Sequence, residues 1–232
     1  MTLGHPREPF WYALSDSQRI ALRDIATHRY YDPDTVICRE NETSDFAIIV
    51  LDGCVKVSAH ASHGYQAILG LRDAGALLGE QAGTDRCPRS ATLTALTLVE
   101  ALILPEPAFR AFLQRHPDVT AILQRTISGR LREADRHRAA AGGEPTPQRL
   151  AALLLDLGRR YGSRTASGAI LIELPLSQED LAGLVLTSHR TIGRILELWR
   201  ERDYVVTGRR KILISAEDEL RRIANGQTQM SR

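Results

Sequence analysis

The chain has 232 residues, and 30 Lys and Arg against 28 Asp and Glu give it a formal net charge of +2. A hydrophobic content of 43% is too high for a disordered chain, and no apolar run approaches the roughly 20 residues of a membrane-spanning helix. The length predicts one or two domains, and the N-terminus lacks the basic and apolar segments of a secretory signal.

The first predicted element is a short helix within residues 10–30. Ser15 is placed to cap it, and Ile20, Leu22 and Ile25 form its apolar face. This pattern predicts a helical entry to the first domain.

Short strands are predicted from about residue 30 to residue 106. Two apolar segments at 45–50 and 54–57 flank Asp52-Gly53, which predicts a β-hairpin with the glycine at positive φ. Regular turn signals between short β segments are typical of an antiparallel roll or barrel. The other segments are residues 65–69, 92–95 and 99–104, and the glycines between them are Gly64, Gly75 and Gly79.

From about residue 106 the apolar side chains recur at helical spacing. Phe109, Phe112 and Leu113 predict a short helix that Pro117 ends, and Asp118 is the expected cap of a longer one. A narrow apolar stripe flanked by charged residues is expected either to pair with a second copy of the chain or to pack onto the chain's own β domain, and both possibilities stay open. The stripe consists of Val119, Ile122, Leu123, Thr126, Ile127, Leu131 and Ala134.

Residues 139–145 are the candidate linker, because Gly142, Gly143 and Pro145 end a helix and allow a hinge. The predicted domains are therefore residues 1–117, a helix and hinge at 118–144, and residues 145–232. Charge supports the division: residues 145–232 contain 14 Lys and Arg against 10 Asp and Glu, a net of +4, and residues 1–144 carry a net of −2.

The C-terminal domain shows the order of a winged helix-turn-helix. After a helix at 147–161 and a strand at 169–174, residues 176–198 read as helix, tight turn, helix. Ser177 with Asp180 forms a candidate capping box for the first of these helices, and Thr187 or Ser188 is the expected cap of the second. Residues 204–214 then predict a β-hairpin with a basic tip.

The second helix of such a unit enters the major groove of DNA with its N-terminal residues near the base edges. Its buried face is predicted to be Ile192, Ile195 and Leu196. Arg190 and Arg194 are four residues apart, so they share a helix face, and arginine can bind a guanine edge with two hydrogen bonds. The candidate base-contacting residues are Ser188, His189, Arg190, Thr191 and Arg194, and the candidate phosphate contacts are Ser177, Gln178, Arg209, Arg210 and Lys211.

The predicted β region contains a second candidate site. Gly79-Glu80-Gln81 is followed, nine positions after Glu80, by Arg89-Ser90-Ala91-Thr92. A carboxylate accepts hydrogen bonds from ribose hydroxyls, and a guanidinium with a serine and backbone N–H groups binds phosphate. The spacing by itself also fits a surface ion pair.

Taken together, these motifs resemble the CRP/FNR family of transcription regulators over about residues 15–220. The resemblance rests on the glycines at 53, 64, 75 and 79, the segment GE…RSAT, the long helix, and SQEDLAGLV…SHRTIGRIL with its wing. It implies an α+β chain with an N-terminal cyclic-nucleotide-binding β-roll of jelly-roll type, a long dimerisation helix and a C-terminal winged helix-turn-helix.

The resemblance also implies a binding site for a cyclic nucleotide. Glu80 would hold the ribose 2′-hydroxyl, and Arg89 and Ser90 would hold the cyclic phosphate, with Gly79, Gln81 and Ala91 beside them. The long helix of the family offers a polar pair to the adenine, where this chain has Ala134 and Asp135. Cyclic AMP is therefore the first expectation, and cyclic GMP, a cyclic dinucleotide or ligand-independent binding are the alternatives.

The DNA-reading half departs from the cyclic AMP receptor protein at two points. His189-Arg190 stands where that protein has Arg-Glu, so the operator is expected to differ at one base pair. Leu186 stands where the turn usually has glycine, and because a leucine at positive φ is strained, a different turn geometry is expected.

Other sensor chemistries of the family fit the sequence less well. Residues 1–37 contain no cysteine, which argues against an iron–sulfur cluster, and His60, His63 and Cys87 supply neither a matched haem ligand nor a zinc pattern. No nucleophile–base set is recognisable, so an enzyme is not expected. The scattered cysteines Cys38, Cys54 and Cys87 fit a reducing cytoplasm.

The sequence thus predicts a cytoplasmic, homodimeric regulator that binds double-stranded DNA and no membrane. An effector would shift the DNA-binding domains through the hinge at Gly142-Gly143. RNA polymerase is a candidate partner because residues 164–169 lie where activators of this family touch it. The alternative from another class is a nucleotide-binding module that does not read DNA.

Overall fold

The computed structural model describes residues 8–60, 66–80 and 87–227. The chain divides within helix α4 (Pro117–Gly143) into two compact units, and the boundary lies between Arg132 and Glu133. Gly64 and Gln81, a predicted turn and a predicted ligand contact, lie outside the described residues. Over the ranges that are described, no helix is both long enough and apolar enough to span a lipid bilayer.

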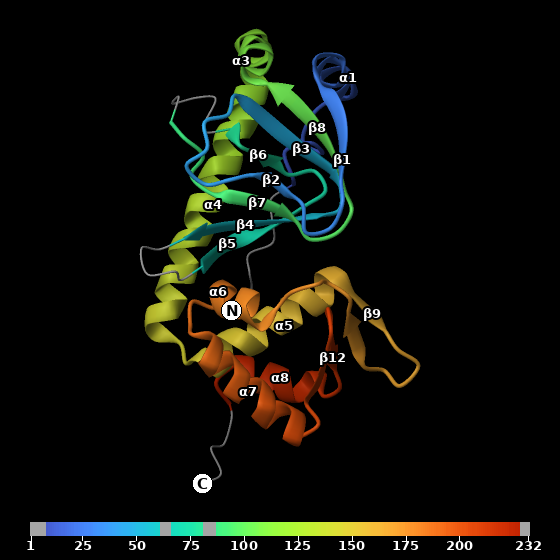
Figure 1. Ribbon diagram of the computed structural model, residues 1–232, viewed down its shortest axis with the longest axis vertical. Helices are drawn as coiled ribbons and strands as arrows, with labels where there is room; N and C mark the ends of the chain where they lie inside the picture. The colour runs from blue at the N-terminus through green and yellow to red at the C-terminus, as the bar shows by residue number, and fades with distance from the viewer. Residues whose placement is uncertain (1–7, 61–65, 81–86, 228–232) are drawn as a thin grey trace. The chain divides into compact units, whose positions relative to one another are not determined.

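The first unit contains two antiparallel four-stranded sheets, ordered β1-β8-β3-β6 and β2-β7-β4-β5 (Figure 1). The predicted roll of short antiparallel strands is therefore confirmed. Its elements are α1 (Asp16–Ile25), β1 (Thr27–Tyr31), β2 (Val36–Cys38), β3 (Phe46–Asp52), β4 (Cys54–His60), β5 (Gln66–Asp73), β6 (Leu77–Leu78), β7 (Thr92–Ala95), β8 (Val99–Pro105) and α3 (Glu106–Arg115), followed by the start of α4.

The hairpin predicted at Asp52-Gly53 is wrong. Strand β3 pairs with β8 along one edge and with β6 along the other, so it has no edge left for β4. The turn instead carries the chain from one sheet to the other, and β4 pairs with β5 and β7. Gly53 nevertheless has the predicted positive φ, +89°, and a Cβ there would lie 2.2 Å from the carbonyl oxygen of Leu98.

Helix α1 is shorter than the sequence predicts. Ser15 caps it as predicted, because its hydroxyl accepts from the backbone N–H of Gln18 and Gln18 reaches back to the Ser15 N–H. The helix ends at Ile25, and residues 27–31 form β1, since pairing with β8 outweighs the helical pattern. Leu22 is fully buried, but Ile20 is 59% exposed and does not belong to the apolar face.

The first half of α4 packs against the first unit. Val119 and Leu123 are buried in the same cluster as Leu104, Phe109 and Phe112, which supports packing onto the chain's own β domain for this half. Leu131, further along the predicted stripe, is 60% exposed.

Asp118 is not the cap of α4. The helix begins at Pro117, a residue type that suits the first helical position, so Asp118 lies in the first turn. Its carboxylate accepts a hydrogen bond from the side-chain amide of Gln18 at 2.5 Å and joins α4 to α1.

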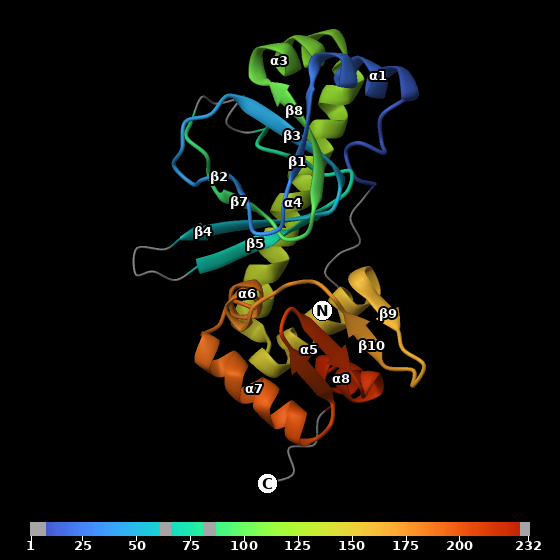
Figure 2. The same ribbon diagram turned by 45° about the vertical axis from the view of Figure 1, so that its right-hand side comes forward.

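The second unit has a four-stranded sheet ordered β11-β12-β10-β9 with helices around it. Ser177 and Asp180 form the predicted capping box, and Ser188 caps the second helix of the pair. Figure 2 shows these two helices, α6 (Gln178–Leu184) and α7 (His189–Glu201), next to each other. The elements are α5 (Thr146–Tyr161), β9 (Gly162–Arg164), β10 (Ile170–Ile172), α6 (Gln178–Leu184), α7 (His189–Glu201), β11 (Val205–Gly208), β12 (Lys211–Ile214) and α8 (Glu217–Ala224).

Leu186, in the turn between α6 and α7, keeps the left-handed conformation with φ of +54°. The different geometry expected for a non-glycine residue is therefore wrong. The turn contains a hydrogen bond from the Thr187 N–H to the Ala182 carbonyl at 3.0 Å, which offsets part of a strain of about 1–2 kcal/mol in one residue.

An ion-pair network at the start of α8 predicts a pH dependence of stability. Arg221 and Arg164 lie 2.5 and 3.0 Å from the Glu217 carboxylate, and the Arg221 hydrogen bond is the main cause of its lowered pKa. A lowered folded-state pKa stabilises the fold above the unfolded pKa, and this stability is lost as the pH falls through the folded value. Urea unfolding between pH 7 and pH 3 should show a smaller acid loss for Glu217→Gln than for the wild type, and high salt should reduce the difference because the network is exposed.

Candidate functional site: a buried arginine and a DNA-reading helix

Arg89 lies in the interior of the first unit with only 3% of its surface exposed. Its guanidinium donates to the Ser44 hydroxyl at 2.5 Å, to the Gly79 carbonyl at 3.0 Å and to the Phe46 carbonyl at 2.6 Å. It also lies over the Phe46 ring, 4.6 Å from the centroid. Within the described part of the chain, the hydrogen-bond acceptors around Arg89 are all uncharged, so its buried positive charge has no carboxylate partner. Such a cation attracts an anion strongly.

Gly79 is required at this position by the approach of Arg89. A Cβ on Gly79 would lie 2.1 Å from the Arg89 guanidinium, and its φ is +72°. Only glycine meets both conditions without strain. Gly79 therefore lets the Arg89 guanidinium approach the backbone closely, and the guanidinium donates to the Gly79 carbonyl.

Glu80 is also buried, at 7% exposure, and forms an ion pair with Arg130 of α4. The Arg130 guanidinium lies 2.6 Å from Glu80 Oε1 and donates a second hydrogen bond to the Leu77 carbonyl. The reading of this motif as a surface ion pair is wrong, because Glu80 and Arg89 are buried and bind different partners in these contacts. Glu80, Arg89 and Arg130 together carry a net charge of +1, which suits a singly charged anion.

The remaining predicted ligand contacts are divided between the units. Ser90 is exposed directly after Arg89, and Ala91 is buried at 8% exposure. Ala134 and Asp135 lie beyond the boundary, in the second unit, where Asp135 pairs with Arg138 at 2.9 Å. Their contact with a base stays a prediction.

Cys87 provides a probe of this site, because it is exposed two residues before Arg89. Cys38 and Cys54 are buried, and burial raises the pKa of the Cys38 thiol. A thiol reagent at pH 8 is expected to label Cys87 first and to slow when an anion occupies the Arg89–Ser90 segment. Labelling can be followed by intact-mass spectrometry; equal rates at all three cysteines would contradict this arrangement.

Helix α7 presents the predicted DNA-reading side chains on one exposed surface. Ser188, His189, Arg190 and Arg194 are exposed, whereas Thr191 is half-buried and its N–H bonds to the Ser188 cap at 3.1 Å. The opposite face packs into the unit. It contains Ile192 and Leu196, both fully buried, with Ile195 half-buried and Trp199 at 3% exposure.

The β11–β12 hairpin forms the wing. Gly208 pairs with Lys211, so Arg209 and Arg210 form its two-residue tip, and all three basic residues are exposed. Arg210 has a left-handed φ of +62°. At the start of α6, the Ser177 hydroxyl bonds to Asp180, and Gln178 is half-buried beside it.

Several residues of these sites lack a signal that sequence reasoning could use. Ser44, Phe46 and Arg130 are 45, 43 and 50 positions away from the residues they bind. In the second unit, Arg200 of α7 donates to Thr207 of β11 at 2.9 Å and ties the DNA-reading helix to the wing. Among the residues that the structure describes, no group of three or more His, Cys, Asp and Glu is arranged to hold a metal ion.

Comparison with protein families finds two matches. Residues 28–116 match the cyclic nucleotide-binding domain, and residues 148–223 match the Crp-like helix-turn-helix domain. The first match covers Glu80 and Arg89, and the second covers α6, α7 and the wing.

Known proteins of similar sequence are transcription regulators. The CRP-like cAMP-activated global transcriptional regulator of Mycobacterium tuberculosis is 29% identical over 185 residues, which cover 80% of this chain and 82% of that protein. The cyclic AMP receptor protein of Thermus thermophilus is 26% identical to this chain. The match covers 94% of this chain and 97% of that protein. Among solved structures, the c-di-GMP responsive regulator CLP of Xanthomonas campestris has the same fold, with a TM-score of 0.76 and 18% sequence identity. The match covers 86% of this chain and 99% of that one.

Proposed function

The chain belongs to the CRP/FNR family of DNA-binding transcription regulators, and we propose that a small nucleotide anion, first of all cyclic AMP, is its effector. The family consists of regulators and not of enzymes. Its Crp-like helix-turn-helix domain removes the alternative of a nucleotide-binding module that does not read DNA. A protein that reads DNA in response to a nucleotide acts in the cytoplasm, where both are present.

The buried Arg89 carries the proposal. A guanidinium has five N–H donors, and three donations to protein oxygens leave donors for an incoming phosphate. The phosphate would gain a charge-assisted hydrogen bond from a buried guanidinium. The exposed Ser90 hydroxyl is next in the chain and would complete the contact.

The charge balance favours a cyclic mononucleotide. Arg130 neutralises Glu80, which leaves the single positive charge of Arg89 for the single negative charge of a cyclic phosphate. Glu80 is also the acceptor we assign to a ribose hydroxyl. Cyclic AMP is supported by the relatives from Mycobacterium tuberculosis and Thermus thermophilus, whose names state that effector. Because Ala134 and Asp135 stand where the family offers a polar pair to the adenine, cyclic GMP, a cyclic dinucleotide and ligand-independent binding stay as alternatives.

Isothermal titration of the full chain with cyclic AMP, cyclic GMP and cyclic di-GMP tests the effector. We expect cyclic AMP to bind with the highest affinity, and Glu80→Gln to weaken it about tenfold because a charged acceptor becomes neutral. Glu106→Gln, which changes a partly buried carboxylate of α3 paired with Arg110, is the matched control. If none of the three nucleotides bound, the ligand-independent reading would replace this one.

For the second unit, we propose a homodimer that binds a roughly palindromic operator. Its two α7 helices would enter successive major grooves, so the half-sites would be about one helical turn apart. The effector would shift an existing equilibrium of the DNA-binding units, and residues 164–169 would contact RNA polymerase. DNA binding measured with and without saturating nucleotide tests the switch, and equal affinities would contradict it.

A further inference from the structure

The junction between α4 and α5 is fastened by a buried arginine. Arg149, in the first turns of α5, is 7% exposed. Its guanidinium donates to the carbonyl oxygens of Ala141 at 3.5 Å, of Glu144, and of Val185 at 2.9 Å. A further contact joins it to the Thr146 hydroxyl at 3.4 Å.

These acceptors lie on both sides of the glycine pair that the sequence marks as a hinge. Ala141 precedes Gly142 and Gly143, and Glu144 follows them. The helix continues through both glycines, and the Glu144 N–H bonds to the Ala140 carbonyl at 2.8 Å. Carbonyl groups at a helix end lack partners within the helix, and here Arg149 supplies them. The glycines therefore lie in a closed junction.

The third acceptor belongs to the turn of the helix-turn-helix. Val185 follows the last residue of α6 and precedes Leu186, which has the left-handed φ of +54°. One planar guanidinium thus binds the end of α4, the start of α5 and the strained turn before α7. Lysine cannot reproduce this, because its ammonium is a single compact donor group.

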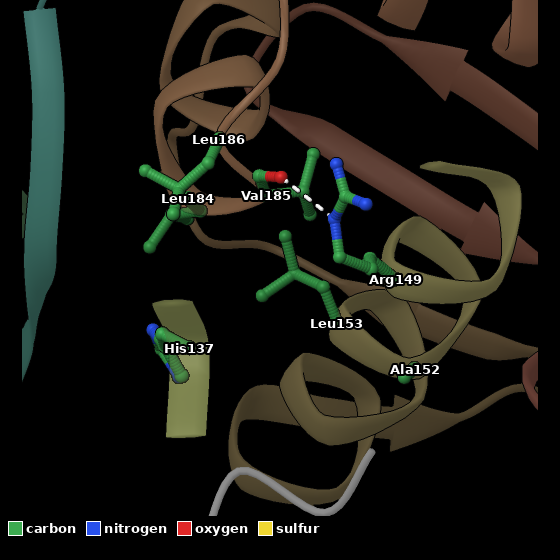
Figure 3. Close-up of a pocket in the computed structure, with 7 residues that line it drawn as sticks. All are labelled: His137, Arg149, Ala152, Leu153, Leu184, Val185 and Leu186. Atoms are coloured by element: carbon green, nitrogen blue, oxygen red, sulfur yellow. Dashed lines mark hydrogen bonds between the residues drawn. The ribbon is translucent and has the colours of Figure 1, made fainter. Parts of the chain in front are cut away.

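Packing around this arginine brings the same elements together. Figure 3 shows Leu153 of α5 with Leu184 of α6 and Leu186 of the turn, and His137 of α4 across a small pocket that they line. Ala140 is buried at 8% exposure. The last turns of α4 belong to the second unit, since the boundary lies before Glu133.

We propose that Arg149 is a positioning residue for DNA reading. By holding Ala141, Glu144 and Val185 together, it fixes the turn before α7 to the last turns of α4, so that these elements move as one body. In a homodimer, this placement sets the distance between the two recognition helices. The inference rests on the proposed homodimeric DNA reading, and the preferred spacing of the two half-sites is the property that Arg149 controls.

The test uses the full chain and an operator obtained by selection from random DNA with the wild-type protein. Affinities are then measured for the selected operator and for versions whose half-sites are one base pair closer or further apart. We expect Arg149→Gln and Arg149→Lys to reduce the preference for the selected spacing by roughly tenfold, with base preference within each half-site unchanged. Arg159→Gln, an exposed arginine of α5 paired with Asp156, is the matched control.

If Arg149 only stabilised the fold, the experiment would give a different result. Arg149 variants would then have a lower melting temperature with the wild-type spacing preference, and this outcome would overturn the proposal. Failure of the wild type to select any DNA would count against the proposed function and would be seen before any variant is made.

A second pair of substitutions keeps the test valid if the Arg149 variants do not fold. Apart from the adjoining backbone of α4, no atom of the described residues lies within 4 Å of a Cβ added at Gly142 or Gly143, so alanine fits at both. We expect Gly142→Ala/Gly143→Ala to keep the wild-type affinity and spacing preference, because the junction is already closed. A changed spacing preference would show that the glycines flex and would overturn the proposal.

Discussion

Alanine at Arg190 or Arg194 is expected to weaken binding to the selected operator by about 1–3 kcal/mol, or roughly five- to 150-fold. Both arginines are exposed on the surface of α7 opposite the buried Ile192 and Leu196. Each variant would lose the bidentate hydrogen bond that we propose to a guanine edge, and a truncated side chain cannot discriminate that base. The affinity should therefore fall for the selected operator and change little for operators altered at that base pair.

Fluorescence anisotropy at one fixed salt concentration measures the affinities for the selected and the altered operators, and a series of salt concentrations measures the salt dependence. Arg222→Ala is the matched control, because Arg222 is an exposed arginine of α8 in the same unit and pairs with Glu219. Alanine at Arg209 or Lys211 of the wing is expected to weaken binding to all sequences alike and to reduce its salt dependence, since these residues are assigned to phosphates. An unchanged base preference in both α7 variants would show that another element reads the operator.

Replacing Arg89 with glutamine is expected to lower the free energy of unfolding by about 3 kcal/mol and to abolish nucleotide binding. The Ser44 hydroxyl and the carbonyl groups of Phe46 and Gly79 all accept from this guanidinium, and the shorter amide cannot reach all three. Buried acceptors without donors account for the loss of stability. The loss of the buried positive charge assigned to the phosphate accounts for the loss of affinity.

The two effects are separated by the lysine variant and by a surface control. Arg89→Lys retains the charge but not the fork of donors, so it should keep part of the affinity and lose most of the same stability. Arg110→Gln removes a half-exposed arginine from α3 in the same unit and should change neither quantity measurably. Urea unfolding gives the stability and titration calorimetry gives the affinity. Nucleotide binding by a folded Arg89→Gln protein at the wild-type affinity would exclude Arg89 as the phosphate contact.

Sequence reasoning succeeded where the signal is local and failed where pairing partners are distant. The capping residues Ser15, Ser177 and Ser188 were predictable, because a cap and the N–H it binds are three residues apart. The hairpin at Asp52-Gly53 was not, because strand β3 is paired on both edges by β6 and β8, and turn residues carry no information about those strands.

The sequence by itself determined the family, the order of its β-rich and helix-turn-helix domains, and the identity of Arg89, Arg190 and Arg194 as candidate contacts, but it did not predict strand β1. Arg190 and Arg194 follow from periodicity and caps, which act within a few residues of the chain, whereas the family and the role of Arg89 rest on the resemblance of motifs spread over most of the chain. The tertiary structure alone decided that Arg130 neutralises Glu80, that Arg149 closes the Gly142–Gly143 junction, and that Leu186 accepts a left-handed turn. Each of these depends on groups that folding brings together from separate elements, and a long side chain such as arginine can reach several of them. The energies of such contacts depend on burial and charge balance, which no local pattern of residues contains.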